Sequence, residues 1–207
     1  EQNALSYLAN LKVLNLSRNK INIIYQEIFK NCPKLEYIQL DSNFISTIQP
    51  NAFYGLEDLK YLSLYSNKVK MVNAKILNGL NKLEILNLSC NNITDIESNS
   101  FMNMKKLKIL HISSNDIEKI NMGFFNGLCS LEKLNLNGNN ISNIDVNSFC
   151  SLENLQSLVL SANKIEFINN EYFNCLSKLE ELYLNKNVLK KVEDYSFKDL
   201  KQLVKLN

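Results

Sequence analysis

Few side chains in this sequence have the types and spacings that could do chemistry. His111 is the only histidine, and around it the sequence shows no Cys–His arrangement, phosphate-binding loop or metal-ligand spacing. Carboxylates such as Glu180 and Glu181 are scattered along positions that we expect to face solvent. We therefore predict a protein that is not an enzyme and uses no metal or cofactor, with His111 as a surface residue at a variable position.

Composition narrows the class of partner. The 207 residues include 23 basic and 21 acidic residues that are well interspersed, with a net charge of +2, so nothing favours nucleic acid. No apolar run reaches the 18 or so residues that a membrane span needs, so we expect no membrane contact by this segment. The first residues, Glu1-Gln2-Asn3-Ala4, lack the basic and apolar regions of a signal peptide.

Leucine recurs at intervals of 24 residues along almost the whole chain. Each recurrence opens the same phrase, Leu-x-x-Leu/Ile-x-Leu/Ile-x-x-Asn-x-apolar-x-x-apolar. The opening leucines are Leu11, Leu35, Leu59, Leu83, Leu107, Leu131, Leu155, Leu179 and Leu203. The asparagines of the phrase are Asn19, Asn43, Asn67, Asn91, Asn115, Asn139, Asn163 and Asn187. A fixed period in this range indicates a solenoid, in which each repeat packs only on its neighbours.

One repeat, residues 131–154, illustrates the expected local structure. Its first residues alternate as a strand does, so Leu134 and Leu136 should face one side of a sheet. Asn139 follows at the turn, where a buried amide can donate to and accept from backbone groups that the turn leaves unpaired. Stacked in register, these asparagines predict a ladder along the solenoid. The equivalent strands should centre on Leu14, Ile38, Leu62, Leu86, Leu110, Leu134, Leu158 and Leu182.

An aromatic position returns on the far side of each repeat, with Leu77 as the one substitute. The rings in register are Phe29, Phe53, Phe101, Phe125, Phe149, Phe173 and Phe197. Phe149 and Leu152 lie three residues apart, as one short helical turn would place them. Because a wall of rings needs more room per repeat than strands about 4.8 Å apart, the stack should curve. We therefore predict an α/β repeat solenoid, with a parallel β-sheet on its concave face and loops, short helical turns and a Phe spine on its convex side.

This pattern resembles the leucine-rich repeat family, in the 24-residue "typical" class of Toll-like receptor ectodomains and other extracellular members. Residues 83–106, LEILNLSCNNITDIESNSFMNMKK, match nearly every defining position. The resemblance covers eight full repeats over residues 11–202, with residues 1–10 as the tail of a preceding repeat and residues 203–207 as the start of a ninth. It implies a horseshoe-shaped arc from a secreted or cell-surface protein. Because the cysteine-rich caps of extracellular members are missing at both ends, we expect a single domain that is a fragment of a longer protein.

The five cysteines are odd in number and unclustered, unlike the even sets of disulfide frameworks. Cys32 stands where most repeats carry leucine, so we expect a small buried hydrophobe. Cys150 and Cys175 occupy nearly equivalent places in successive repeats and could lie within the roughly 7 Å between Cα atoms that a disulfide needs. We expect free thiols, with a bridge between these two residues as the alternative.

Glycosylation sequons begin at Asn15, Asn87, Asn92 and Asn140, a number that chance alone explains in so asparagine-rich a chain. Asn92 and Asn140 are the better acceptors, because they lie just past the ladder asparagine in a turn that should be exposed. Glycans on Asn15 or Asn87 would instead lie on the concave face and block binding there.

The outward strand positions carry the one surface pattern that indicates a site. In the first five repeats the first of these positions is apolar or aromatic: Val13, Tyr37, Tyr61, Ile85 and Ile109. Tyrosine is enriched among interface anchors, although branched and aromatic residues are also simply favourable in strands. We predict that a protein ligand or co-receptor docks on the concave face across repeats two to five. Its expected contacts are Tyr37, Tyr61 and Tyr65 as anchors, with Ile85, Ile109 and His111 as neighbours.

These observations favour a protein-recognition module, the ligand-binding region of a secreted or cell-surface receptor, for which the resemblance includes innate immune proteins. Two alternatives stay open. One is an intracellular, cytoplasmic scaffold or adaptor, which the odd cysteine count favours. The other is the targeting domain of a larger enzyme.

Overall fold

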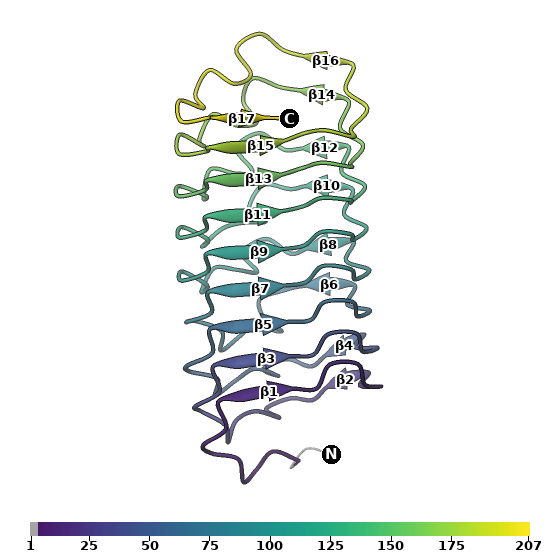
Figure 1. The fold of residues 1–207 in the computed structure, drawn as a ribbon, viewed down its shortest axis with the longest axis vertical. Coiled ribbons are helices and arrows are strands. Elements are labelled where there is room, and N and C mark those ends of the chain that lie inside the picture. Colours follow the sequence, from purple (N-terminus) through teal and green to yellow (C-terminus); the bar gives the residue numbers. More distant parts are fainter. Residues whose placement is uncertain (1–3) are drawn as a thin grey trace.

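In the computed structural model, residues 4–207 form a parallel β-solenoid whose coils stack along one long axis, with the two ends of the chain at opposite ends of the stack (Figure 1). Residues 1–3, which belong to the segment considered above for a signal peptide, lie outside the described residues. Among the described residues, no helix is long and apolar enough to cross a membrane.

One side of the solenoid is a continuous sheet of nine parallel strands, in which each strand pairs with the equivalent strand of the adjacent repeat (Figure 1). Its strands are β1 (Val13–Asn15), β3 (Tyr37–Gln39), β5 (Tyr61–Ser63), β7 (Ile85–Asn87), β9 (Ile109–His111), β11 (Lys133–Asn135), β13 (Ser157–Val159), β15 (Glu181–Tyr183) and β17 (Lys205–Leu206). Every strand centre predicted from the sequence is the middle residue of one of the first eight strands, and each points into the core.

A second set of strands, two residues each, was not predicted. They are β2 (Ile23–Ile24), β4 (Thr47–Ile48), β6 (Met71–Val72), β8 (Asp95–Ile96), β10 (Lys119–Ile120), β12 (Asn143–Ile144), β14 (Phe167–Ile168) and β16 (Lys191–Val192). These strands pair only two by two, as β2–β4, β6–β8, β10–β12 and β14–β16. In every pair the first strand comes from an odd-numbered repeat and the second from the next repeat.

The predicted helical turns are wrong, because none of the described residues is helical. Near Phe125 the backbone closes isolated turns, in which Leu128 N–H donates to Phe125 C=O (3.2 Å) and Leu131 N–H donates to Leu128 C=O (3.1 Å). A helix needs such bonds at successive residues, whereas here they are three residues apart. Phe125 and Leu128 thus lie at the two ends of one isolated turn, and the fold class is a β-solenoid rather than an α/β one.

The core is one strip that runs between the two sets of strands. Its aromatic part is a stack of buried rings, with centroid distances of 6.0 Å for Phe29–Phe53, 5.8 Å for Phe125–Phe149 and 6.3 Å for Phe149–Phe173. Offset stacking at these separations is favourable beyond the burial of apolar area. The buried aromatic cluster therefore links successive repeats on the side opposite the large sheet.

Asparagine amides tie each repeat to the one before it. The Asn91 Nδ2 group donates to Leu64 C=O of the preceding repeat and to Leu88 C=O of its own, both at 3.0 Å. Its Oδ1 accepts from Val69 N–H at 2.9 Å, again in the preceding repeat. Equivalent bonds link Asn43, Asn67, Asn115, Asn139, Asn163 and Asn187 to the coils before them. With a further bond from Asn91 Nδ2 to Ser89 C=O (3.3 Å), one side chain satisfies four backbone groups that the turns would otherwise bury unpaired.

The residue before each ladder asparagine has a left-handed backbone. Positive φ values between 53° and 59° occur at Arg18, Ser42, Ser66, Cys90, Ser114, Ala162 and Lys186, and Gly138 has a φ of 67°. This conformation costs free energy in a residue with a Cβ. It aims each N–H at the next repeat, as where Ser66 N–H donates to Ser89 C=O (3.0 Å). The coil-to-coil hydrogen bond offsets the strain.

We expect Asn115→Ala to lower the free energy of unfolding by about 1–3 kcal/mol, since three buried backbone groups lose their partner. Asn19→Ala is the matched control, because Asn19 is exposed and the hydrogen bonds described for it stay within its own repeat. Denaturant unfolding of both variants measures the difference. Equal effects, or a loss below about 0.5 kcal/mol for Asn115→Ala, would show that water satisfies these turns.

Candidate recognition surface on the nine-stranded sheet

The outward side chains of the nine-stranded sheet form a surface that we call the sheet face. Strand alternation turns the middle residue of each strand inward and its two neighbours outward. In-register pairing of successive repeats then stacks equivalent outward residues in columns, as in Tyr37 beside Tyr61 and Asn87 beside His111. The sheet face therefore repeats one position per strand along the solenoid.

The first column begins with an apolar stripe, which comprises Val13, Tyr37, Tyr61, Ile85 and Ile109. Val13 is 59% exposed and Tyr37 45% exposed, whereas the other three side chains are half-buried against their neighbours. The rings of Tyr37 and Tyr61 lie 6.1 Å apart at a tilt of 30°. The stripe ends at Lys133, which is exposed on β11.

A row of opposite charges borders the stripe. Glu36 lies between two lysines, 2.7 Å from Lys60 Nζ and 3.4 Å from Lys12 Nζ, and Lys108 Nζ lies 3.0 Å from Glu84. Hydrogen bonding to Lys60, and next to Lys12, lowers the pKa of the Glu36 carboxyl, and the same contact raises the pKa of Lys60. These charges compensate one another, so the border adds little net charge to the stripe.

The other border of the stripe is polar. Ser63 Oγ donates to Asp41 Oδ1, and the Tyr65 N–H donates to the same oxygen at 3.2 Å. The Tyr65 side chain is 41% exposed, and the neighbouring Cys90 thiol raises the pKa of its hydroxyl. The structure therefore brings Tyr65 to the same surface as Tyr61 and Ile85, but in a separate column from them.

His111 occupies the polar column of β9, half-buried and paired in register with Asn87 and Asn135. Burial, and then the nearby positive charge of Lys133, lower the pKa of its imidazole. The lowered pKa favours the neutral form of the His111 imidazole. No group of three or more His, Cys, Asp or Glu side chains within residues 4–207 is arranged to hold a metal ion.

The sequon residues lie at different exposures. Asn92 is exposed at the turn beyond the ladder, where its backbone N–H donates to Val69 C=O at 3.0 Å, whereas Asn140 is half-buried. Asn15 and Asn87 lie on the sheet face, at the ends of β1 and β7.

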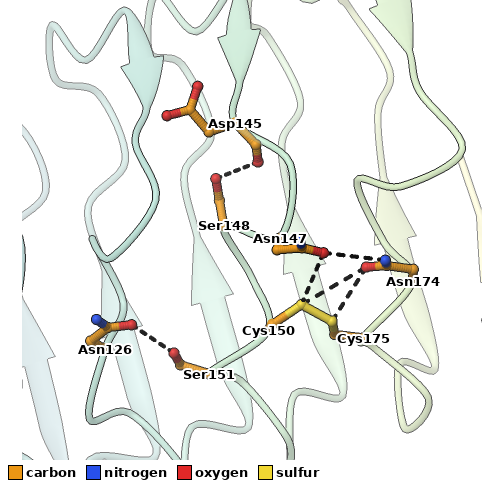
Figure 2. Close-up of a disulfide and its surroundings, with 8 residues drawn as sticks. All are labelled: Asn126, Asp145, Asn147, Ser148, Cys150, Ser151, Asn174 and Cys175. Carbon is orange, nitrogen blue, oxygen red and sulfur yellow. Dashed lines mark hydrogen bonds between the residues drawn. A yellow bond between two sulfur atoms is a disulfide. The ribbon is translucent and has the colours of Figure 1, made fainter.

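The expectation of free thiols is wrong for two of the five cysteines. Cys150 and Cys175 form a disulfide with their Cα atoms 4.9 Å apart, on the loop side of the solenoid (Figure 2). Stacking of successive coils brings the two nearly equivalent positions within bonding reach, which an odd count could not reveal. Cys32, Cys90 and Cys129 are free, and Cys32 is fully buried as its leucine-like position predicts.

The sequence contains a pattern that predicts the row of Lys–Glu pairs beside the stripe, although these pairs were not among our predictions. Lysine and glutamate alternate at one position of successive repeats, as in Lys12, Glu36, Lys60, Glu84 and Lys108. In a stacked parallel sheet this alternation places opposite charges on adjacent strands, where cross-strand pairs interact. The register of the repeats was therefore a sufficient signal for these ion pairs.

The depressed pKa of His111 makes the stability of the folded chain depend on pH. Below about pH 6.5 the unfolded chain protonates this imidazole, while the folded chain resists protonation until a lower pH. We therefore expect stability to fall as the pH drops through that window, and His111→Asn to lack this contribution. Because the chain has one histidine, a proton NMR titration of untagged protein gives one midpoint. A midpoint at or above the ordinary value would contradict the burial argument.

Comparison with known proteins agrees with this geometry. The sequence profile described as "Leucine rich repeat" matches residues 9–69, 59–117, 105–165 and 153–207. No curated protein sequence matches the chain.

Two solved structures superpose well on the solenoid. One is that of the TLR13-ssRNA13 complex, at 25% identity and a TM-score of 0.77, over 99% of this chain and 37% of that one. The other is an octameric complex of Latrophilin 3, Unc5D and FLRT2 (LRR), at 30% identity and a TM-score of 0.85, over 94% of this chain and 59% of that one. The chain thus spans less than two thirds of either neighbour. Repeat phrase, asparagine ladder, parallel sheet and profile matches agree, and the chain belongs to the leucine-rich repeat family.

Proposed function

We propose that residues 1–207 are a single protein-recognition domain, the ligand-binding region of a secreted or cell-surface leucine-rich repeat receptor. The observation that carries this proposal is the apolar stripe, a partly exposed row of tyrosine and branched side chains on the nine-stranded sheet. In this proposal the solenoid curves with the sheet face on its concave side, so that a partner would lie against the stripe.

Charge favours a protein partner over a nucleic acid. Binding of a phosphate backbone needs basic side chains that are free to replace counterions. The lysines that border the stripe, Lys12, Lys60 and Lys108, are each paired with a glutamate. One structural neighbour is described in a complex with ssRNA and the other in a complex of proteins. For this chain the neutral border supports the second kind of partner, a protein ligand or co-receptor.

The anchors lie where an interface would bury them most. The rings of Tyr37 and Tyr61 lie side by side on adjacent strands. Tyr65 follows two residues after Ser63, the last residue of β5. Aromatic side chains in the centre of a contact carry a large share of binding free energy, whereas the surrounding residues mainly exclude water. We assign that surrounding role to Ile85, Ile109 and His111.

The Cys150–Cys175 disulfide supports an extracellular or cell-surface location, because disulfides persist in oxidising compartments. Similarity to the TLR13 and FLRT2 structures supports the same location. An intracellular scaffold is the alternative, and a role in innate immunity or as the targeting domain of a larger enzyme depends on regions outside this sequence.

We expect Tyr61→Ala to weaken binding of the protein partner by about 2 kcal/mol or more while leaving unfolding nearly unchanged. The partner is first isolated from the native source with the wild-type domain, and the purified pair is then titrated by calorimetry. Phe167→Ala is the matched control, because Phe167 is 52% exposed on β14, away from the sheet face. If Phe167→Ala weakens binding and Tyr61→Ala does not, the partner binds elsewhere and the stripe is ordinary strand composition.

Secretion through a eukaryotic pathway should add an N-linked glycan at Asn92, whose side chain is exposed in the sequence Asn-Ile-Thr. Asn140 should be modified less, because it is half-buried. Intact mass before and after enzymatic deglycosylation, in wild type and in Asn92→Gln, measures the occupancy. Secreted protein that carries its glycan mainly at Asn87 would contradict an open sheet face.

A further inference from the structure

On the loop side of the solenoid, opposite the turns of the Asn ladder, one kind of side-chain contact occurs only at every second interface between coils. Pairs of asparagine amides join neighbouring repeats at Asn51–Asn78 (2.8 Å), Asn99–Asn126 (2.8 Å) and Asn147–Asn174 (3.3 Å). These contacts, which we call amide clasps, connect repeats two and three, four and five, and six and seven. The short strand pairs connect the other interfaces, from β2–β4 to β14–β16. Within residues 4–207, amide clasps and short strand pairs therefore alternate from one interface to the next along the loop side.

Small and large side chains alternate with the same period of two repeats. One core position on the loop side holds Ala52, Ser100, Ser148 and Ser196 in even-numbered repeats, and Ile28, Ile76, Phe124 and Tyr172 in odd-numbered ones. The buried Ser148 hydroxyl donates to Ile120 C=O of the preceding repeat at 3.3 Å. The two kinds of interface thus differ in packing as well as in hydrogen bonding.

Beside each amide clasp, the two coils approach very closely. A Cβ on Gly79 would lie 2.6 Å from Phe53 O, and a Cβ on Gly127 would lie 2.5 Å from Met102 Cα, so only glycine fits in these two clasps. Cys175 holds the position of Gly127 two repeats further along the chain, and Cys150 likewise holds the position of Met102. In the third clasp a disulfide therefore replaces the close glycine contact (Figure 2).

The interface with the disulfide is the last one between full repeats that lacks a short strand pair, so besides the disulfide and the amide clasp the C-terminal repeats are held there by the β11–β13 pairing and the Asn163 amide. The short strands β12 and β14 do not pair across it, whereas β14 pairs with β16 and so holds repeats seven and eight together. Beyond it the packing is looser, since Val188 is 53% exposed and Val192 is 47% exposed. In a repeat solenoid, stability is a sum of nearest-neighbour terms, so a change at one interface is felt by the repeats beyond it.

We propose that Cys150–Cys175 is a reducible latch between repeats six and seven, whose redox state controls whether the C-terminal repeats stay docked. Both cysteines are half-exposed, so a dithiol reductant can reach the bridge. A reductant thiolate attacks one sulfur and the Cys–Cys bond breaks, while the departing thiolate takes up a proton. The second reductant thiol then displaces the mixed disulfide, so the reductant is oxidised to a disulfide and two cysteine thiols remain. The apolar stripe, in repeats one to five, lies outside the segment that the latch controls.

The test is hydrogen exchange of the whole chain, followed by mass spectrometry, with and without tris(2-carboxyethyl)phosphine or dithiothreitol. Opening a loop closed over 25 residues should speed exchange in the strands of repeats seven and eight and the start of the ninth, β13 to β17, by about 100-fold, because the cross-link no longer restricts local unfolding. Exchange in β3 to β9 should stay unchanged. Equal acceleration everywhere, no acceleration in the C-terminal strands, or free thiols at Cys150 and Cys175 in protein purified under air would each overturn the latch.

Two variants separate the latch from the other thiols. The double variant Cys150→Ala with Cys175→Ala should exchange like reduced wild type and ignore reductant. The double variant Cys150→Met with Cys175→Gly rebuilds the contact of the preceding clasp, so it should be more protected than the alanine pair and equally insensitive to reductant. Reductant sensitivity that persists in either variant would assign the effect to Cys32, Cys90 or Cys129 and overturn the proposal.

Discussion

The structure depends on one constraint: every coil buries a turn whose backbone groups have no partner within the coil itself. An asparagine side chain meets this need because it carries both donors and an acceptor. The Asn91 amide reaches three carbonyl oxygens and one N–H, two of these four in the preceding repeat. Each coil is therefore completed by the next asparagine along the chain. Strand register, core packing and the left-handed residue before each asparagine follow from that dependence.

Because the ladder and the inward leucines fix the coil, the outward strand positions have no structural role in common. They hold Tyr61 and Ile85 in one part of the sheet and Lys133 in the next. A partner surface can therefore be placed on the sheet without altering the core. The row of Lys–Glu pairs beside the stripe keeps this surface nearly neutral, so apolar contact rather than net charge would select the partner.

On the loop side, adjacent coils are joined in two different ways. At one kind of interface short strands pair through their backbones, and at the other kind amide clasps join the coils. Glycines allow close approach at both kinds, since a Cβ on Gly55 would lie 2.9 Å from Lys30 Cα where β2 and β4 pair. The disulfide belongs to the second kind, at a place where two Cα atoms were already close. Covalent bonding there strengthens an interface without a short strand pair, at a distance from the apolar stripe.

The sequence by itself determined the period, the strand centres, the positions of the asparagines and the stacked phenylalanines. Each of these depends only on counting residues within one repeat, because alternation along a strand is a local property. Leu86 at the centre of β7 and Asn91 in the turn after it could be placed from their own repeat alone.

The features that depend on contacts between repeats are determined only by the tertiary structure. Whether Phe125 and Leu128 belong to a helix or to one isolated turn depends on whether successive N–H groups around them also make turn hydrogen bonds, which they do not. The short strands, the Cys150–Cys175 bond and the lowered pKa of His111 likewise depend on the distance and rotation from one coil to the next. A repeat motif specifies a single coil well. It does not specify that distance and rotation, because they result from the packing of all the side chains that two coils share.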